Sequence, residues 1–169
     1  MTSQQERIVH IRRNIEDYGD PYLQDLKPDE VAVCVECRSV YAGKRWEMRD
    51  QAARDLREAK RVVETLCPAC RKIRDRAPGG IVTLSGEFLA KHEEEIINLI
   101  NHESKRAMEI NPLERLIDIE RSDTKIIILT TNEKLAQRIG RALYKAYRGK
   151  VEYKWSEDNK LARVNWHRD

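Results

Sequence analysis

The alternation of apolar and polar residues in the first half of the chain predicts short strands followed by a helix. Val31–Cys34 is a short apolar run typical of a strand, and residues 40–46 fit a strand, a turn at Ala42-Gly43 and a second strand. Long side chains of good helix propensity fill residues 48–65. We therefore expect a helix over that stretch, with an apolar side formed by Leu56, Ala59 and Val63.

The middle of the chain predicts one long amphipathic helix. Residues 71–76 read as a basic turn that stops at Pro78-Gly79-Gly80. A helix is expected over residues 87–108, and Asn111-Pro112 ends it. Its acidic side begins with Glu93–Glu95. Its apolar side is formed by Phe88, Leu89, His92, Ile96, Leu99 and Ile100.

The last third of the chain predicts a ββαββ arrangement. Asn132 can cap a helix, and Gly149 can end it. The apolar run Ile126–Leu129 is typical of a central strand that is buried on both faces. The expected elements are strands at 116–120 and 125–130, a helix from 132 to about 147, and strands at 150–155 and 161–166.

The last two strands are expected to form a hairpin with a four-residue loop at 156–159. That loop would place Tyr153 opposite Ala162 and Val151 opposite Val164. Lys150, Lys154 and Arg163 then fall on one face. The other face would carry Val151, Tyr153, Trp155, Ala162, Val164 and Trp166.

Composition limits the size of any hydrophobic core. The chain has 169 residues, of which 36% are charged and only 6% are aromatic. A core of that kind is modest, so a bound metal ion would supplement it. No apolar run reaches the length of a membrane span, and the polar N-terminus has no signal-peptide core, so a soluble cytoplasmic protein is expected.

The four cysteines form two pairs, Cys34/Cys37 and Cys67/Cys70, separated by residues 38–66. This spacing matches a structural site in which four thiolates hold one tetrahedral zinc ion. The segment between the pairs is longer than the usual roughly 15–20 residues, so the predicted helix would fill it. We therefore expect one structural zinc ion on all four cysteines.

Two other uses of these cysteines fit less well. Cys67-Pro-Ala-Cys70 alone would suit a thioredoxin-like redox pair, but Thr65-Leu66 does not provide the apolar strand that should precede it. That reading also leaves the first pair unexplained. Disulfides need an oxidising compartment, for which the N-terminus gives no signal.

These features predict an α+β fold with a four-cysteine zinc ribbon that contains a helical insert. The regions expected are a flexible N-terminal arm at 1–30, the zinc ribbon at 31–76, a helical connector at 77–112 and a ββαββ domain at 113–169.

The positive charge is concentrated in two of these regions. The formal net charge is only +3, yet Lys and Arg outnumber Asp and Glu by six over residues 38–76 and again by six over residues 125–169. An acidic stretch separates the two blocks. The candidate phosphate-binding residues of the first block are Lys44, Arg45, Arg71, Lys72 and Arg74.

The second block contains a regular line of cations on the predicted helix. The five residues lie within an arc of roughly 80°, and no acid interrupts the line, so they repel one another unless an anionic partner faces them. They are Lys134, Arg138, Arg141, Lys145 and Arg148. An ordinary solvated helix face is the alternative for this line, and solvated loops are the alternative for the first block.

The order of several motifs resembles a bacterial family of small, uncharacterised zinc-ribbon proteins. That family is similar to the N-terminal part of the archaeal and eukaryotic adaptor that exports the large ribosomal subunit. The resemblance covers about residues 31–168. The motifs are Cys34-x-x-Cys37, Lys44-Arg45-Trp46, Cys67-Pro-Ala-Cys70-Arg-Lys-Ile-Arg-Asp, Thr83-Leu-Ser-Gly-x-Phe88, Glu95-Ile-Ile-Asn-Leu-Ile100, Pro112-Leu-Glu-Arg-Leu-Ile-Asp-Ile119 and Thr130-Thr131-x-x-x-Leu135-Ala136-x-Arg138-Ile139-Gly140.

This resemblance implies a zinc ribbon on the four cysteines and makes ribosomal RNA or the ribosome the implied partner. The chain also departs from the pattern. The adaptor has further cysteine pairs and domains that this chain lacks, so export activity is not implied. Around the first pair, Val35-Glu36 and Arg38 replace the more usual Pro and Gly, which changes the turn but removes no ligand.

The resulting hypothesis is a non-enzymatic protein that binds structured RNA and associates with the ribosome, in translation or in large-subunit assembly or quality control. Ribosomal proteins are further candidate partners, whereas a membrane and a small-molecule substrate are not expected. Phosphate-binding Gly-x-x-x-x-Gly-Lys and Gly-x-Ser-x-Gly motifs are absent. The alternatives are a protein–protein adaptor that uses the acidic helix and the N-terminal arm, and a DNA-binding regulator.

Overall fold

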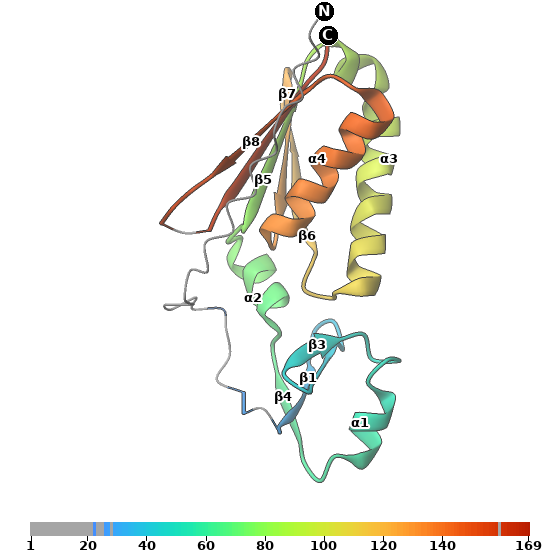
Figure 1. The fold of residues 1–169 in the computed structure, drawn as a ribbon, viewed down its shortest axis with the longest axis vertical. Helices are drawn as coiled ribbons and strands as arrows, with labels where there is room; N and C mark the ends of the chain where they lie inside the picture. Colours follow the sequence, from blue (N-terminus) through green and yellow to red (C-terminus); the bar gives the residue numbers. More distant parts are fainter. Residues whose placement is uncertain (1–21, 23–25, 28, 159) are drawn as a thin grey trace, which may run out of the picture.

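The computed structural model describes residues 22, 26–27, 29–158 and 160–169. These residues form a mixed α/β structure with four helices and two mixed sheets (Figure 1). The flexible arm predicted for residues 1–30 lies mostly outside the described residues. None of the helices in the described part of the chain is long and apolar enough to span a membrane.

The N-terminal sheet has the strand order β3-β2-β1-β4. Strand β1 lies between β2 and β4, and it is antiparallel to β2 and parallel to β4. Three of its four residues are buried, which explains the apolar run in the sequence. The strands are β1 (Val31–Cys34), β2 (Val40–Ala42), β3 (Arg45–Glu47) and β4 (Val62–Thr65).

The predicted helix over residues 48–65 is wrong over much of its length. Helix α1 covers only Ala53–Glu58, and Ala59 already has an extended backbone with ψ 128°. Residues 62–65 instead form β4, because their backbone groups pair with β1 in a parallel ladder. Tertiary pairing therefore overrides the helical spacing of Val63.

The basic turn predicted at residues 71–76 is also wrong, because this stretch belongs to a helix. Helix α2 spans Pro68–Asp75 and begins one residue after Cys67. The Cys67 sulfur accepts a hydrogen bond from the Cys70 amide, and proline suits the first helical position. The helix ends at Arg76, which adopts a left-handed conformation.

The C-terminal sheet has five strands in the order β6-β7-β5-β9-β8. Its middle strand is β5, which is antiparallel to β7 and parallel to β9. The predicted ββαββ arrangement therefore lacks the central strand of the sheet. That strand, β5, comes from residues 77–112, which were predicted to be a helical connector. The strands are β5 (Gly80–Ser85), β6 (Leu116–Arg121), β7 (Lys125–Thr130), β8 (Lys150–Trp155) and β9 (Ala162–His167).

Helices α3 (Glu87–Ile110) and α4 (Glu133–Tyr147) lie on the same face of this sheet (Figure 1). Their apolar sides and the sheet share one core cluster, which includes Leu84, Ile96, Ile139 and Trp166. The backbone of α3 is interrupted at His92, whose ring stacks on Phe88. The described residues place no helix on the opposite face of the sheet.

The predicted register of the last hairpin is wrong by two residues, although the faces are right. Tyr153 pairs with Val164 and Trp155 pairs with Ala162, so the loop spans residues 156–161. The Ser156 amide donates to the Leu161 carbonyl at 3.0 Å and closes this longer loop. Because side chains alternate between the two faces of a strand, a register shift of two residues leaves every side chain on its predicted face.

Candidate metal centre and basic surfaces

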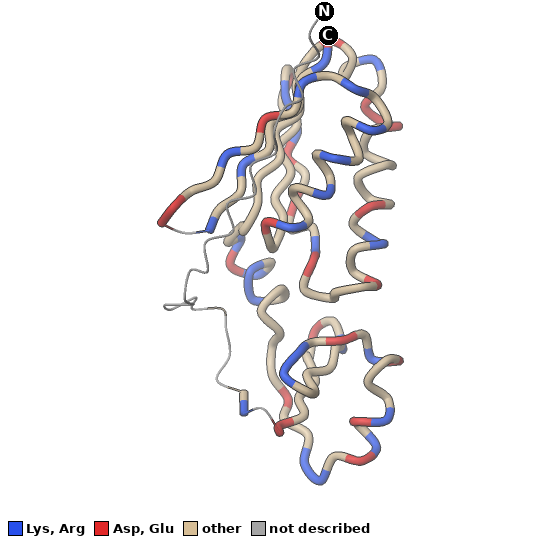
Figure 2. Tube along the Cα trace, viewed as in Figure 1, with Lys and Arg blue, Asp and Glu red and all other residues tan. Residues whose placement is uncertain are grey.

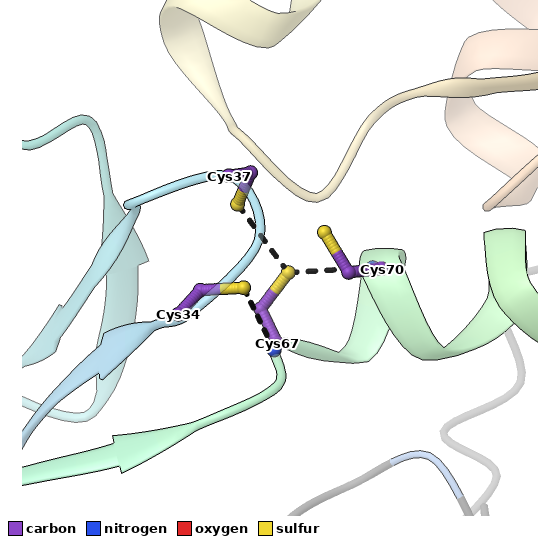
Figure 3. A group of neighbouring side chains, drawn as sticks. All are labelled: Cys34, Cys37, Cys67 and Cys70. Carbon is purple, nitrogen blue, oxygen red and sulfur yellow. Dashed lines mark hydrogen bonds between the residues drawn. The ribbon is translucent and has the colours of Figure 1, made fainter.

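The four cysteines converge where the N-terminal sheet meets α2 (Figure 3). Cys34 is the last residue of β1, Cys37 follows in the next turn, and Cys67 and Cys70 lie at the start of α2. Their Sγ atoms all lie within 4.8 Å of one another. Within the described part of the chain, this is the one group that brings together three or more candidate metal ligands.

The sulfur spacing fits a tetrahedral ion. Zinc–sulfur bonds of about 2.3 Å in a tetrahedron give sulfur–sulfur separations of about 3.8 Å. The Cys37 and Cys67 sulfurs are already 3.7 Å apart. Three of the four cysteines are buried and Cys37 is partly buried, so the site is shielded from solvent. The cluster can hold one metal ion with small side-chain adjustments.

Parallel pairing of β1 and β4 is what brings the two cysteine pairs together. In this ladder Cys34 lies opposite Thr65, and the Val35 amide donates to the Thr65 carbonyl at 2.9 Å. Cys67 follows only two residues later, so the turn after β1 and the first turn of α2 face each other. The pairs are thus presented by different structures, a turn after a strand and a helix N-terminus.

Each of the four sulfurs has a hydrogen-bonding neighbour. The Cys67 amide donates to Cys34 Sγ and the Cys70 amide donates to Cys67 Sγ, both at 3.3 Å. Ser39 Oγ lies 3.0 Å from Cys37 Sγ, and Arg115 Nη1 donates to Cys70 Sγ at 3.7 Å. Donors aimed at sulfur stabilise the thiolate form that binds metal.

The hydrogen bonding within the cluster separates the pKa values of the thiols. The contact with Cys67 is the largest cause that lowers the pKa of Cys37, to about 4. The same contact, followed by burial, raises the pKa of Cys67 far above its usual range. Burial is the largest cause that raises the pKa of Cys70 to about 11. Metal loading would therefore displace the protons of Cys67 and Cys70, and metal affinity falls as the pH falls.

Arg115 and Ser39 were not among the residues predicted from sequence. Arg115 lies just before β6, far along the chain from Cys70, and its amide donates to Thr131 Oγ1 at 2.9 Å. Only the docking of α2 against β6 brings its guanidinium to the cluster. No local pattern in the sequence signals that contact.

Helix α2 connects the metal centre to the C-terminal sheet (Figure 1). Lys72 Nζ donates to the Thr131 carbonyl at 3.1 Å, just before α4. At the other end of α2, Arg76 forms ion pairs with Asp118 at 2.9 Å and with Glu120 at 2.6 Å. The metal centre thus lies at the junction of the two sheets.

The predicted cations near the metal centre have different environments. Lys44 lies on the exposed turn between β2 and β3, and Arg45 is the exposed first residue of β3, where it pairs with Glu47. This turn belongs to the N-terminal sheet, whereas the predicted helix cations belong to the C-terminal part of the fold (Figure 2).

The three predicted cations of α2 are all engaged within the fold. Arg71 Nε donates to the Leu66 carbonyl at 3.1 Å, and Lys72 holds α2 against the C-terminal sheet as described above. Arg74 is exposed and pairs with its neighbour Asp75. In α2 the basic side chains therefore support local structure as well as contributing charge.

The line of cations on α4 is exposed except at one position. The exposed residues are Lys134, Arg141, Lys145 and Arg148. The prediction that Arg148 continues the helical line is wrong, because it is the C-cap of α4 and its backbone, with φ 58° and ψ −140°, leaves the helix. Arg138 instead pairs with Glu103 of α3 at 2.9 Å, and both side chains are largely buried. The expectation that no acid faces this line is therefore wrong at Arg138, because α3 packs beside α4.

No protein-family model, curated protein sequence or solved structure matches the chain. Function is therefore inferred from the cysteine cluster and from the exposed charged and aromatic side chains.

Proposed function

We propose that this chain is a non-enzymatic protein that binds structured RNA, and that one zinc ion in a four-cysteine zinc-ribbon site stabilises its N-terminal part. This proposal rests on three exposed cations of α4 and on exposed Arg148, which follows the helix as its C-cap. Figure 2 shows the basic positions along this part of the chain. The resemblance of the sequence to a ribosome-linked family makes ribosomal RNA the first RNA to test. A role on the ribosome, in translation or in large-subunit assembly or quality control, belongs to the same proposal.

Zinc is proposed because of the donor set. Four thiolates at tetrahedral spacing favour zinc over the hard cations that prefer oxygen ligands. The four sulfurs would complete the coordination shell, so no position is left for a catalytic water. The ion is therefore assigned a structural role, and the proposal includes no catalytic step.

RNA is proposed because the exposed cations of this line lack ion-pair partners in the described part of the chain. Within that part of the chain, Lys134, Arg141, Lys145 and Arg148 form no ion pair with a carboxylate. The charge of Lys134 does, however, act on the nearby carboxyl of Glu114, where it offsets part of the rise in pKa that burial causes. Arg141 and Lys145 are like charges four residues apart on α4, and such a pair destabilises a helix by a few tenths of a kcal/mol. A row of phosphates would remove this repulsion and would gain free energy from counterion release.

The adaptor alternative receives less support, because acids of α3 already have partners within the fold. Glu93 pairs with Arg121 at 2.8 Å, and Glu103 pairs with Arg138. The DNA-binding alternative uses the same phosphate contacts, so only a direct comparison of nucleic acids separates it from RNA binding.

Sedimentation of cell lysate through gradients at low and moderate salt tests the proposal. The tagged protein should migrate with ribosomal particles at low salt and shift toward free protein as salt rises. Arg141→Gln/Lys145→Gln should weaken this association, with about two fewer ions in the salt slope of binding to purified ribosomal RNA.

Lys91→Gln/Lys105→Gln on α3 is the charge-matched control and should bind like the wild type. If the wild type migrated only as free protein at both salt concentrations, association with the ribosome would be excluded. Tighter binding to duplex DNA than to ribosomal RNA would replace RNA with DNA as the partner.

A further inference from the structure

Two exposed aromatic side chains lie on the same side of the fold as the α4 cations. Tyr144 on α4 is 48% exposed and Trp155 at the end of β8 is 52% exposed. The other two tryptophans, Trp46 and Trp166, are buried. Tyr144 and Trp155 are the aromatic residues among the exposed large hydrophobic side chains of the described protein.

The packing of α4 on β8 places the two rings along one edge. Tyr153 of β8 reaches α4 at Gly140, where an added Cβ atom would lie only 3.0 Å from the Tyr153 hydroxyl oxygen. Tyr144 lies one helical turn beyond Gly140 and so projects on the same side of α4. Trp155 lies two residues beyond Tyr153 and so projects on the same face of β8.

The two rings lie on opposite sides of this contact. The start of α4 lies over Gly80, because a Cβ atom added to Gly80 would lie 2.6 Å from Ala136 Cβ. Gly80 is aligned across the sheet with Ala162 of β9, which in turn is aligned with Trp155 of β8. Helix α4 ends at Arg148, whose carbonyl accepts from the Trp166 indole nitrogen at 2.8 Å. Helix and strand therefore run in opposite directions, and the rings are roughly 13 Å apart along the edge.

Cations lie between and beside the rings. The Arg148 guanidinium is 5.4 Å from the centroid of the Tyr144 ring. Arg141 is near the Tyr153 phenol, where its charge offsets part of the increase in pKa that burial causes. Lys145 follows Tyr144 and is exposed. We call the surface formed by Arg141, Tyr144, Lys145, Arg148 and Trp155 the aromatic–basic edge.

We propose that the aromatic–basic edge binds a short unpaired RNA segment, whose bases stack on Tyr144 and Trp155 while its phosphates contact the cations. This inference rests on the proposed RNA-binding function and deepens it. Flat exposed rings among cations suit single strands, because an unpaired base presents its face for stacking and a base within a duplex does not. A loop, bulge or end of a structured RNA would supply such a segment.

Direct binding measurements with a fluorescein-labelled uridine 12-mer and an RNA duplex of the same length test this inference. Trp155→Ala and Tyr144→Ala should each weaken binding of the single strand by about 5- to 150-fold, since stacking contributes about 1–3 kcal/mol per base. Binding of the duplex should change little. Trp155→Phe keeps a ring and should recover most of the affinity. Ile110→Ala is the control, because it removes another exposed apolar side chain far along α3.

Two further readouts identify stacking. The salt slope of single-strand binding should be unchanged in Trp155→Ala, whereas Arg141→Gln should lower it by about one. The single strand should also quench tryptophan fluorescence in the wild type but not in Trp155→Phe, because the remaining tryptophans are buried.

The outcomes separate this inference from the function on which it rests. If the protein binds neither single-stranded nor duplex RNA and does not associate with ribosomal particles, the proposed function fails. If it binds RNA but Tyr144→Ala and Trp155→Ala bind like the wild type, the aromatic–basic edge is not the binding surface and this inference fails alone. Equal loss of duplex and single-strand binding in those variants would likewise exclude base stacking.

Discussion

Cys67 contributes to the candidate metal centre through both its sulfur and its backbone amide. Its sulfur accepts from the Cys70 amide and lies 3.7 Å from the Cys37 sulfur, and its own amide donates to Cys34. The residue also caps α2. Replacing it would therefore affect both the donor set and the helix that presents half of that set.

Cys67→Ser is expected to reduce bound zinc from one ion per chain to nearly none and to unfold residues 31–76. Structural zinc supplies about 10 kcal/mol or more of folding free energy in small zinc domains, so the remaining three ligands should not hold the fold. Elemental analysis and far-UV circular dichroism measure both effects. Val35→Ser is the control, because Val35 is exposed between the first two cysteines. A Cys67→Ser protein with full metal content and native structure would contradict the four-thiolate site.

Glu114 is an ionisable residue in an unfavourable environment. Its side chain is buried, and burial is the largest cause that raises the pKa of its carboxyl. Lys134 and Arg138 offset part of this effect. Because the folded pKa is higher than the unfolded one, the folded state binds the proton more tightly, and stability is lost as the pH rises through the folded pKa.

Glu114→Gln should therefore stabilise the protein at pH 7, with a rise in melting temperature of roughly 2–4 °C. The advantage should shrink as the pH falls through the raised pKa, since the wild-type carboxyl then becomes neutral. Thermal unfolding at several pH values checks this. Glu109→Gln on the exposed side of α3 should show no such pH-dependent gain. A gain that is independent of pH would indicate a cause other than ionisation.

The β8–β9 hairpin carries two like charges directly opposite each other. Lys154 pairs with Arg163 across the ladder, on the face of the sheet away from the helices, and neither forms an ion pair within the described residues. Like charges in this position are destabilising, and opposite charges contribute about 0.2–1 kcal/mol. The neighbouring acid Glu152 is already paired with Lys150 at 3.0 Å.

Arg163→Glu should raise the free energy of unfolding by about 0.5–1 kcal/mol, because it replaces a repulsive pair with an attractive one. Arg163→Gln removes only the repulsion and should give a smaller gain. Urea denaturation measures both, and high salt should reduce the difference between them. If the two variants were equally stable at low salt, cross-strand charge would not control the stability of this hairpin.

The elements that the sequence predicted well are those whose determinants are local. Asn132 accepts from the Leu135 amide as a cap, and the apolar stripe of α4 packs as expected. The faces of β8 and β9 followed from alternation even though the register did not. Strands β4 and β5 were missed because both are defined by partners far away in the chain, β1 for the first and β7 and β9 for the second.

The same distinction applies to the metal centre. Cysteine spacing was sufficient to predict the four-residue cluster, because each pair lies within one turn of chain. It could not predict Arg115, whose approach to Cys70 depends on how α2 docks against β6. Nor could it predict that Arg138 is neutralised by Glu103, since that pair depends on the packing of α3 beside α4.

At the scale of the whole molecule, the two sheets have separate cores. The core of the C-terminal sheet contains Val82, Ile128 and Val164 together with the apolar sides of α3 and α4. The N-terminal sheet depends on two smaller clusters, one of which includes Trp46 and the four cysteines. A small sheet without a large core would be stabilised more strongly by a metal ion bound at the cysteine cluster.

Removing the metal with a chelator should therefore open residues 31–76 and leave the C-terminal sheet folded. Hydrogen exchange measured by mass spectrometry should become roughly 100-fold faster or more in β1, β2 and β4, equivalent to about 3 kcal/mol of lost protection. Exchange in β5, β7 and β9 should change little, because the core of that sheet includes no cysteine. Trp46→Phe serves as an optical control, since it should abolish any red shift in tryptophan emission while Trp166 remains buried. Equal loss of protection in both sheets would instead show that α2 couples them into one cooperative unit, through the contacts of Arg115 with Cys70 and of Lys72 with Thr131.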